Sequence, residues 1–168
     1  MNIKDELLRR ILTDKDIGNF LPMLHDRALD FVGPEILEFG TWKGSSSIAF
    51  LNAIEKVGGH LTSLDIKSFP IAEKLADNHA DFLIQDSRTF ESDKQYDIIL
   101  VDSYHNYKQV KAECLVIDKI IKEGTIIFFH DPIYKPEIQP AINEFISNHK
   151  CTVKKYPENK GMWEVEIL

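Results

Sequence analysis

The spacing of apolar and polar residues changes character near residue 35. Before that point, residues 3–13 and 17–32 carry apolar side chains at helical spacing, which predicts two amphipathic helices. We expect Asp16 to cap the second helix and Gly33-Pro34 to end it. From Glu35 onward, short apolar runs replace the helical spacing, so a different architecture begins there.

Five short runs, mostly rich in β-forming residues, follow this change. They cover residues 35–39, 60–65, 81–86, 96–102 and 125–131. Most are separated by segments of helical spacing, of which 45–58 and 107–124 are the clearest; 136–150 is a third, whose pattern Pro140 interrupts. Strands that alternate with helices predict βαβ units and a parallel sheet.

The C-terminal tail departs from this alternation. Residues 151–157 and 161–168 both read as strands, and only "ENK" separates them. So short a loop allows only an antiparallel hairpin. Together the runs predict a single α/β domain over residues 1–168, with a doubly wound, mostly parallel seven-stranded sheet that ends in an antiparallel hairpin.

Composition limits the classes of protein to consider. The 168 residues are 43% hydrophobic, enough for one core, and the net charge of −7 argues against a protein that coats nucleic acid. Cys114 and Cys151 form no C-x-x-C pair, so we expect free thiols in a reducing compartment. No segment has the length or apolarity of a signal peptide or membrane span, and we therefore expect a soluble cytoplasmic protein.

A glycine-containing loop joins the first strand of the sheet to the next helix. In "EFGTWKGSS", Gly40 and Gly44 allow a tight turn and close backbone approach, and Ser45 or Ser46 can start the helix. The G-x-x-x-G spacing lacks the middle glycine of the dinucleotide-binding fingerprint, and bulky Trp42 stands nearby. This disfavours a nicotinamide enzyme, although a ligand-free structural turn is an equal alternative for the loop by itself.

Acidic residues stand at the ends of the second and third strands. Asp65 follows Gly44 by 21 residues and could accept hydrogen bonds from ribose hydroxyls, while Asp86 ends the third strand. An acid at a strand end is often only a helix cap. The order of glycine loop and two acids is therefore more informative than any one of them.

With these features in place, residues 35–168 resemble the class I S-adenosylmethionine-dependent methyltransferases. "LEFGTWKG" is similar to the first motif of that family and "YDIILVD" to the fourth. The phrases "VDSYHNYKQVKAE" and "GTIIFFHD" resemble the subgroup of macrocin-type sugar O-methyltransferases and cephalosporin-hydroxylase-like proteins. Two features depart from the subgroup: Tyr104 stands where it often has Asp, and the chain has no evident substrate-binding insertion.

The resemblance implies a Rossmann-like fold, with residues 1–34 as added helices and 35–168 as the cofactor-binding core, and a seventh strand inserted beside the fifth. It places Glu38 at the methionine end of S-adenosylmethionine, Asp65 at the ribose and Asp86 at the adenine amino group. The cofactor-binding residues that we expect are Glu38, Gly40, Thr41, Trp42, Gly44, Ser45, Asp65, Asp86 and Asp102.

Paired Asp and His residues follow the fourth and fifth strands. These strands should be neighbours about 4.8 Å apart, which would bring Asp102 and Asp131 together. Close carboxylates share a proton or hold a cation, and a divalent ion such as Mg²⁺ or Mn²⁺ would lower the pKa of a substrate hydroxyl. We therefore predict a metal site of Asp102, His130 and Asp131, with His105 as the general base.

Structural alternatives exist for each of these residues. His105 could be an exposed loop histidine, His130-Asp131 a capped strand end, and Tyr104 and Tyr107 packing residues instead of acceptor-pocket residues. The preferred function is metal-assisted O-methylation of a sugar or other small metabolite. An inactive S-adenosylmethionine-binding partner or regulator and a nucleotide-sugar or dinucleotide enzyme are the alternatives. We expect no nucleic acid or membrane partner, and a homo-oligomer could complete the pocket.

Overall fold

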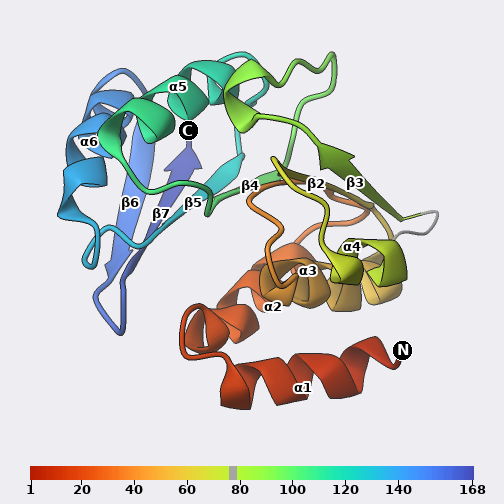
Figure 1. Cartoon of the computed structure of the whole chain (residues 1–168). Coiled ribbons are helices and arrows are strands. Elements are labelled where there is room, and N and C mark those ends of the chain that lie inside the picture. Colours follow the sequence, from red (N-terminus) through yellow and green to blue (C-terminus); the bar gives the residue numbers. More distant parts are fainter. Residues whose placement is uncertain (76–78) are drawn as a thin grey trace.

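A computed structural model describes residues 1–75 and 79–168 of the chain and shows a single mixed sheet between two layers of helices (Figure 1). The strand order is β3-β2-β1-β4-β5-β7-β6. The strands are β1 (Glu35–Phe39), β2 (His60–Asp65), β3 (Ala80–Ile84), β4 (Ile98–Val101), β5 (Ile126–His130), β6 (Cys151–Tyr156) and β7 (Met162–Ile167). The predicted fold class is confirmed.

Pairing within the sheet follows the predicted pattern. β1 to β5 are parallel, whereas β7 is antiparallel to both β5 and β6. The predicted hairpin therefore forms and inserts β7 beside β5. The strand order reverses between β1 and β4, and the loops that follow these two strands come together at the carboxyl end of the sheet, where open α/β sheets bind ligands.

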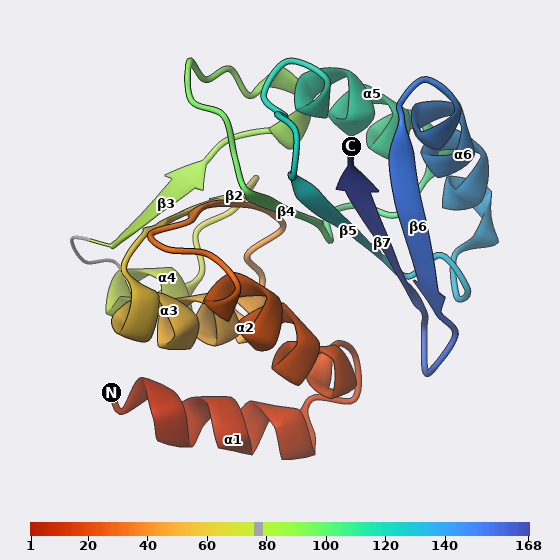
Figure 2. The same ribbon diagram turned by 180° about the vertical axis from the view of Figure 1, so that it is seen from behind.

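The helices cover both faces of the sheet. Helices α1 (Ile3–Thr13), α2 (Leu21–Leu29), α3 (Ser45–Val57) and α4 (Pro70–Leu75) lie on one face, and α5 (Tyr107–Ile117) and α6 (Gln139–Ser147) lie on the other (Figure 2). Successive residues of the central strands alternate between the two apolar cores. Ile98 and Leu100 pack under α2 and α3, while Ile99 and Val101 pack under α5 and α6.

Several predicted element boundaries need correction. The second N-terminal helix is shorter than 17–32: a 3-10 turn, Gly18–Phe20, precedes α2, and Pro22 stands in the first turn of α2. Asp16 does not cap it. The N-cap residue of the 3-10 turn is Ile17 and that of α2 is Phe20, while the Asp14 side chain accepts the amide of Asp16 at 2.9 Å.

The long helix predicted for 107–124 ends at Ile117, and residues 118–120 continue as a turn that leads to β5. The helix predicted for 136–150 divides into a 3-10 turn, Pro136–Ile138, and α6, with Pro140 in the first turn of α6, where its missing N–H costs nothing. The strand predicted for 81–86 forms as Ala80–Ile84, so it begins and ends earlier than predicted. The strands predicted for 96–102 and 125–131 are shorter at both ends. Helix α4 was not predicted from the sequence as a separate helix.

Among residues 1–75 and 79–168, no helix is long and apolar enough to cross a membrane.

Candidate active site

A cavity of about 690 Å³ opens at the carboxyl end of the sheet. Its wall is built from the loops that follow β1, β2, β3 and β4, together with residues from the turn between α1 and α2. This volume lies within the usual range for small-molecule sites, about 300–1,000 Å³. The cavity is therefore large enough for a cofactor and lies where this class of sheet binds ligands.

The loop after β1 has the tight geometry that its glycines predicted. Gly40 has φ +104°, and a Cβ there would lie 2.2 Å from the backbone oxygen of Asp102. Gly44 has φ +69° and occupies the N-cap of α3. Trp42 also has a positive φ, +37°, which is strained for a residue with a side chain. The loop thus holds its backbone close to β4 and presents the indole at the cavity.

Asp65 orders this loop as well as facing the cavity. Its Oδ2 accepts the amides of Thr41 and Trp42, each at 3.1 Å, and its Oδ1 accepts the amide of Lys67 at 3.3 Å. A carboxylate has about four acceptor positions, so capacity for a further donor remains. Asp65 can therefore fix the loop and still accept a hydrogen bond from a ligand.

Asp86 follows β3 and lines the cavity. Its Oδ1 accepts the amide of Arg88 at 3.0 Å, so it caps the short turn Ser87–Thr89. The Arg88 guanidinium also pairs with the carboxylate and lowers the pKa of Asp86. Both the cap predicted as the structural alternative and a place in the ligand cavity are therefore present.

Glu38 lies beneath the cavity wall and is fully buried. Its carboxyl group accepts hydrogen bonds from the hydroxyls of Ser46, Ser47 and Ser63. Burial raises its pKa to about 7, although the three hydroxyl donors oppose this shift. Glu38 thus holds the start of α3 against β1 and β2, and its predicted contact with the methionine end of a cofactor stays a prediction.

Most of the predicted cofactor residues meet around this one cavity. Those that line it are Gly40, Thr41, Trp42, Ser45, Asp65, Asp86 and Asp102, whereas Glu38 and Gly44 do not. The Ser45 hydroxyl donates to Asp14 at 2.5 Å and accepts from Arg10 at 2.9 Å. Helix α1 is thereby tied to the cavity, a link the sequence did not reveal.

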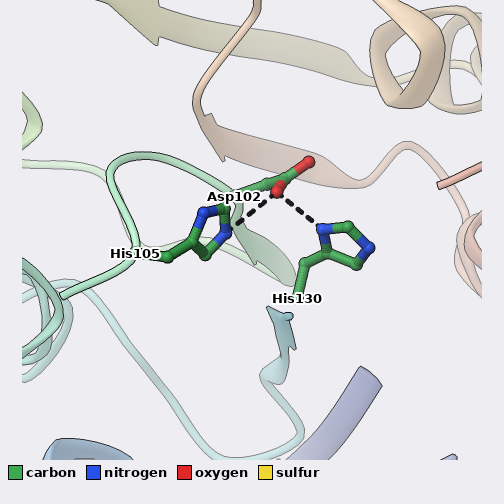
Figure 3. A group of neighbouring side chains, drawn as sticks. All are labelled: Asp102, His105 and His130. Carbon is green, nitrogen blue, oxygen red and sulfur yellow. Dashed lines mark hydrogen bonds and ion pairs between the residues drawn. The ribbon is translucent and has the colours of Figure 1, made fainter. Parts of the chain in front are cut away.

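Two histidines converge on one carboxylate at the edge of the cavity (Figure 3). Asp102 Oδ1 lies 2.8 Å from His130 Nδ1 and 3.2 Å from His105 Nε2. Burial opposes ionisation of Asp102, but the two imidazoles outweigh it and lower the pKa of this carboxyl. His130 is buried, whereas His105 is partly exposed and lines the cavity, so only His105 faces the space a ligand would occupy.

Asp131 directly follows β5 and lies close to both histidines. Its carboxylate is 3.3 Å from His130 Nδ1 and 3.7 Å from His105 Nδ1. Burial raises the pKa of Asp131 against the pull of the histidines. Its φ of +68° lies in the left-handed region, a backbone conformation that the sequence did not predict.

The predicted metal ligands divide between two groups that share His130. One consists of Asp102, His105 and His130, and the other of Asp16, His130 and Asp131; in each, one donor atom per residue lies within 4.8 Å of the others. Asp102 and Asp131 therefore do not form one three-residue set with His130. Asp16 belongs to a group that the sequence analysis missed, because it comes from a turn more than a hundred residues away.

The residues present fit a divalent cation. Among the described residues, His130 Nε2 and Asp131 Oδ1 are buried atoms without a hydrogen-bond partner. An unpaired buried polar atom is costly, and a cation would satisfy both. Imidazole and carboxylate ligands together suit Mn²⁺, Fe²⁺ or Zn²⁺ better than Mg²⁺.

A second buried carboxyl group lies behind the cavity on α5. Glu113 is fully buried, and its Oε1 accepts hydrogen bonds from the hydroxyls of Ser87 and Ser103 and from Gln109. Burial raises its pKa, and these donors oppose the shift. Glu113 thereby joins the loops after β3 and β4. Its polar position on the apolar face of a helix was the only signal in the sequence.

Of the two tyrosines considered for the acceptor pocket, Tyr104 lines the cavity and is largely exposed. Tyr107 instead donates a hydrogen bond to Glu144 at 2.9 Å, on the outer side of α5 and α6.

The chain matches one family model. Residues 37–132, more than half of the chain, match a family model described as a methyltransferase domain. No curated protein sequence matches the chain.

Solved structures share the fold at low sequence identity. The methyltransferase PaMTH1 of Podospora anserina, bound to S-adenosylhomocysteine, has a TM-score of 0.72 and 14% identity over 100% of this chain and 88% of its own. CalS11, a TDP-rhamnose 3′-O-methyltransferase of calicheamicin biosynthesis, has a TM-score of 0.71 and 14% identity over 92% of this chain and 79% of its own. MycE, a methyltransferase of mycinamycin biosynthesis in complex with Mg and S-adenosylhomocysteine, has a TM-score of 0.70 and 16% identity over 96% of this chain and 53% of its own.

The residues that the family model matches include the glycine loop, both acidic strand ends, Asp102 and His130, and all three structures share the fold over at least 92% of this chain. The chain therefore belongs to the methyltransferase-domain family and is a class I S-adenosylmethionine-dependent methyltransferase.

Proposed function

We propose that this enzyme transfers the methyl group of S-adenosylmethionine to a hydroxyl of a sugar or other small metabolite, with help from a divalent metal. The observation that carries the proposal is the convergence of His105 and His130 on Asp102 at the edge of the cofactor cavity. A methyltransferase needs such a cluster when its acceptor must lose a proton.

A neutral hydroxyl is a poor nucleophile, so its proton must leave as the methyl group arrives. His105 is the group that would take it, because its imidazole lines the cavity and is held between Asp102 and Asp131. His130 is the positioning partner, since it is buried and its Nδ1 is hydrogen-bonded to Asp102.

His130 would hold the metal, either with Asp16 and Asp131 or with Asp102 and His105. When bound, the ion would lower the pKa of the acceptor hydroxyl and fix its position. Two of the similar structures support this reading by analogy: CalS11 is a sugar O-methyltransferase and MycE contains Mg.

The cofactor would lie across the loop after β1. Asp65 and Asp86 both line the cavity, where Asp65 would accept from the ribose hydroxyls and Asp86 would face the adenine, and the Gly40 backbone would allow close approach. The resemblance to the macrocin-type subgroup supports the same arrangement.

The test is release of S-adenosylhomocysteine over a panel of hydroxyl compounds, with and without Mn²⁺. Turnover that depends on an acceptor supports the proposal. Tight binding of S-adenosylhomocysteine without any turnover would favour the inactive binding partner, and retention of a nicotinamide cofactor after purification would favour a dinucleotide enzyme.

The expected partners follow from the proposed chemistry. The principal partner is a small-molecule acceptor. Three further points stay predictions: a homo-oligomer that completes the acceptor pocket, the absence of nucleic acid and membrane partners, and a cytoplasmic location.

A further inference from the structure

A second groove, of about 610 Å³, borders the cofactor cavity. It lies between the C-terminal half of α1, the turn after α1, the loop after β1 and the β6–β7 loop. Its lining residues are Arg9, Arg10, Thr13, Asp14, Lys15, Asp16, Trp42, Lys43 and Lys160. Four of them, Asp14, Asp16, Trp42 and Lys43, also line the cofactor cavity, so the two spaces are continuous.

The groove is basic although the chain as a whole has a net charge of −7. Five of its nine lining residues are Arg or Lys and only two are acidic. Glu6, beside the groove, pairs with both Arg9 and Arg10. Even with Glu6 counted, the groove carries two more positive than negative charges.

Some of these cations are available to a ligand. Lys15 and Lys43 are exposed, and neither forms an ion pair with a residue in the described part of the chain. Lys43 Nζ instead lies 4.0 Å from the Trp42 ring centroid. Arg9 is exposed as well and shares the single carboxylate of Glu6 with Arg10. An anion could therefore bind here without breaking a buried ion pair.

The junction of the two spaces lies next to the proposed catalytic groups. Asp16 lines both, and it belongs to the same close group as His130 and Asp131. Trp42 lines both as well, is 48% exposed and is held at a positive φ. An exposed indole on a strained backbone indicates a side chain held in place for contact, because strain of this kind persists mainly at functional sites.

We propose that this groove binds a phosphate or diphosphate group of the methyl acceptor, whose reacting hydroxyl then lies at the Asp16 junction. The inference rests on the proposed function and names its substrate class: a phosphorylated or nucleotide-linked hydroxyl compound. The groove has more arginine and lysine residues than are needed to bind a ligand with a single carboxylate. This favours a ligand with the larger negative charge of a phosphoryl group. Trp42 would stack on a ring of the acceptor.

Inorganic pyrophosphate, titrated by calorimetry into the full-length protein saturated with S-adenosylhomocysteine, tests the proposal. S-adenosylhomocysteine would occupy the cofactor cavity and so keep the anion from binding there. We expect millimolar or tighter binding that weakens with salt, and about tenfold weaker binding in the triple variant Arg9→Gln, Lys15→Gln, Lys43→Gln. Lys119→Gln, an exposed lysine in the turn that follows α5, is the control and should bind as the unmutated protein does.

Equal pyrophosphate affinity in the triple variant, or competition between pyrophosphate and S-adenosylhomocysteine, would overturn the groove assignment. So would absence of pyrophosphate binding in a protein that binds S-adenosylhomocysteine normally, and that result would leave the proposed function standing. Failure to bind S-adenosylhomocysteine would instead defeat the proposed function itself. Arg10 is left unchanged because its contact with Ser45 supports the fold.

Discussion

His130 Nδ1 lies 2.8 Å from Asp102 Oδ1, and this contact joins the end of β5 to the end of β4. A carboxylate can only accept, so Nδ1 carries the proton and, in neutral His130, the lone pair is on Nε2. That atom is buried without a partner among the described residues. Burial lowers the pKa of His130, but the neighbouring Asp102 carboxylate outweighs it and raises the pKa. His130 is therefore suited to coordinate a cation through Nε2 or to position His105 through Asp102.

Cofactor binding depends first on Asp65. S-adenosylhomocysteine should bind the unmutated protein with micromolar affinity, and Asp65→Ala should lose about 1.5–3 kcal/mol, because it removes a charged acceptor that also orders the amides of Thr41 and Trp42. Calorimetry measures both. Asp93→Ala, at an exposed site away from the cavity, is the control. An unmutated protein that binds no S-adenosylhomocysteine would contradict the assigned cofactor.

A bound metal should raise thermal stability. At a Mn²⁺ concentration of about 100 times Kd, mass action contributes about 2.7 kcal/mol, or about 5–10 °C in Tm for a chain of this size. Asp131→Asn should abolish the rise if Asp131 is a ligand. Asp16→Asn distinguishes the two candidate groups, since it should abolish the rise only if the ion lies with Asp16, His130 and Asp131.

An equal rise in both variants would place the ion with Asp102, His105 and His130. No rise in the unmutated protein, with S-adenosylhomocysteine present, would leave a metal-free mechanism.

Turnover should depend on His105. His105→Ala should keep its affinity for S-adenosylhomocysteine and lose about 10²–10⁴-fold in kcat, the usual contribution of a general base. The low-pH limb of the rate profile should change as well, because that limb reports protonation of the base. Single-turnover assays with an acceptor measure both effects.

His130→Ala is the comparison variant for this assignment. If it loses activity while His105→Ala keeps most of it, the two roles are reversed. If neither substitution matters, the histidines are structural.

Folding stability should vary with pH through Glu38. Its folded-state pKa is raised from 4.5 to about 7, so the folded protein holds a proton that the unfolded chain releases. The resulting stabilisation is fully present below pH 4.5 and is lost as the pH rises through 7, in all about 3 kcal/mol. Urea unfolding at several pH values should show this decline in the unmutated protein relative to Glu38→Gln, which cannot titrate. Parallel pH profiles for the two proteins would show that Glu38 stays ionised.

The sequence by itself determined the fold and the order of its functional segments. Short β-rich runs at 35–39, 60–65 and 96–102, most of them separated by segments of helical spacing, predicted parallel strands, because strands that alternate with helices form βαβ units. The short "ENK" loop required the antiparallel hairpin. Gly40 and the acids after the strands were recognisable from local chemistry, since these residue types recur where strand ends meet a ligand.

Helix ends were less accessible to the sequence. The patterns at 17–32 and 107–124 continue apolar spacing beyond the real helices, because residues in a tight turn can pack on the same core as the helix before it. Ile120 is such a residue: it lies past the end of α5 and is buried with the α5 side chains.

Only the tertiary structure decided which polar groups meet. Asp16 joins His130 and Asp131 across a separation of more than a hundred residues, and Ser63 reaches Glu38 from a neighbouring strand. The basic groove likewise combines α1, the loop after β1 and Lys160 of the hairpin. Local sequence encodes each segment's conformation, but the meeting of side chains from distant segments depends on how helices and strands pack, and no periodicity along the chain records it.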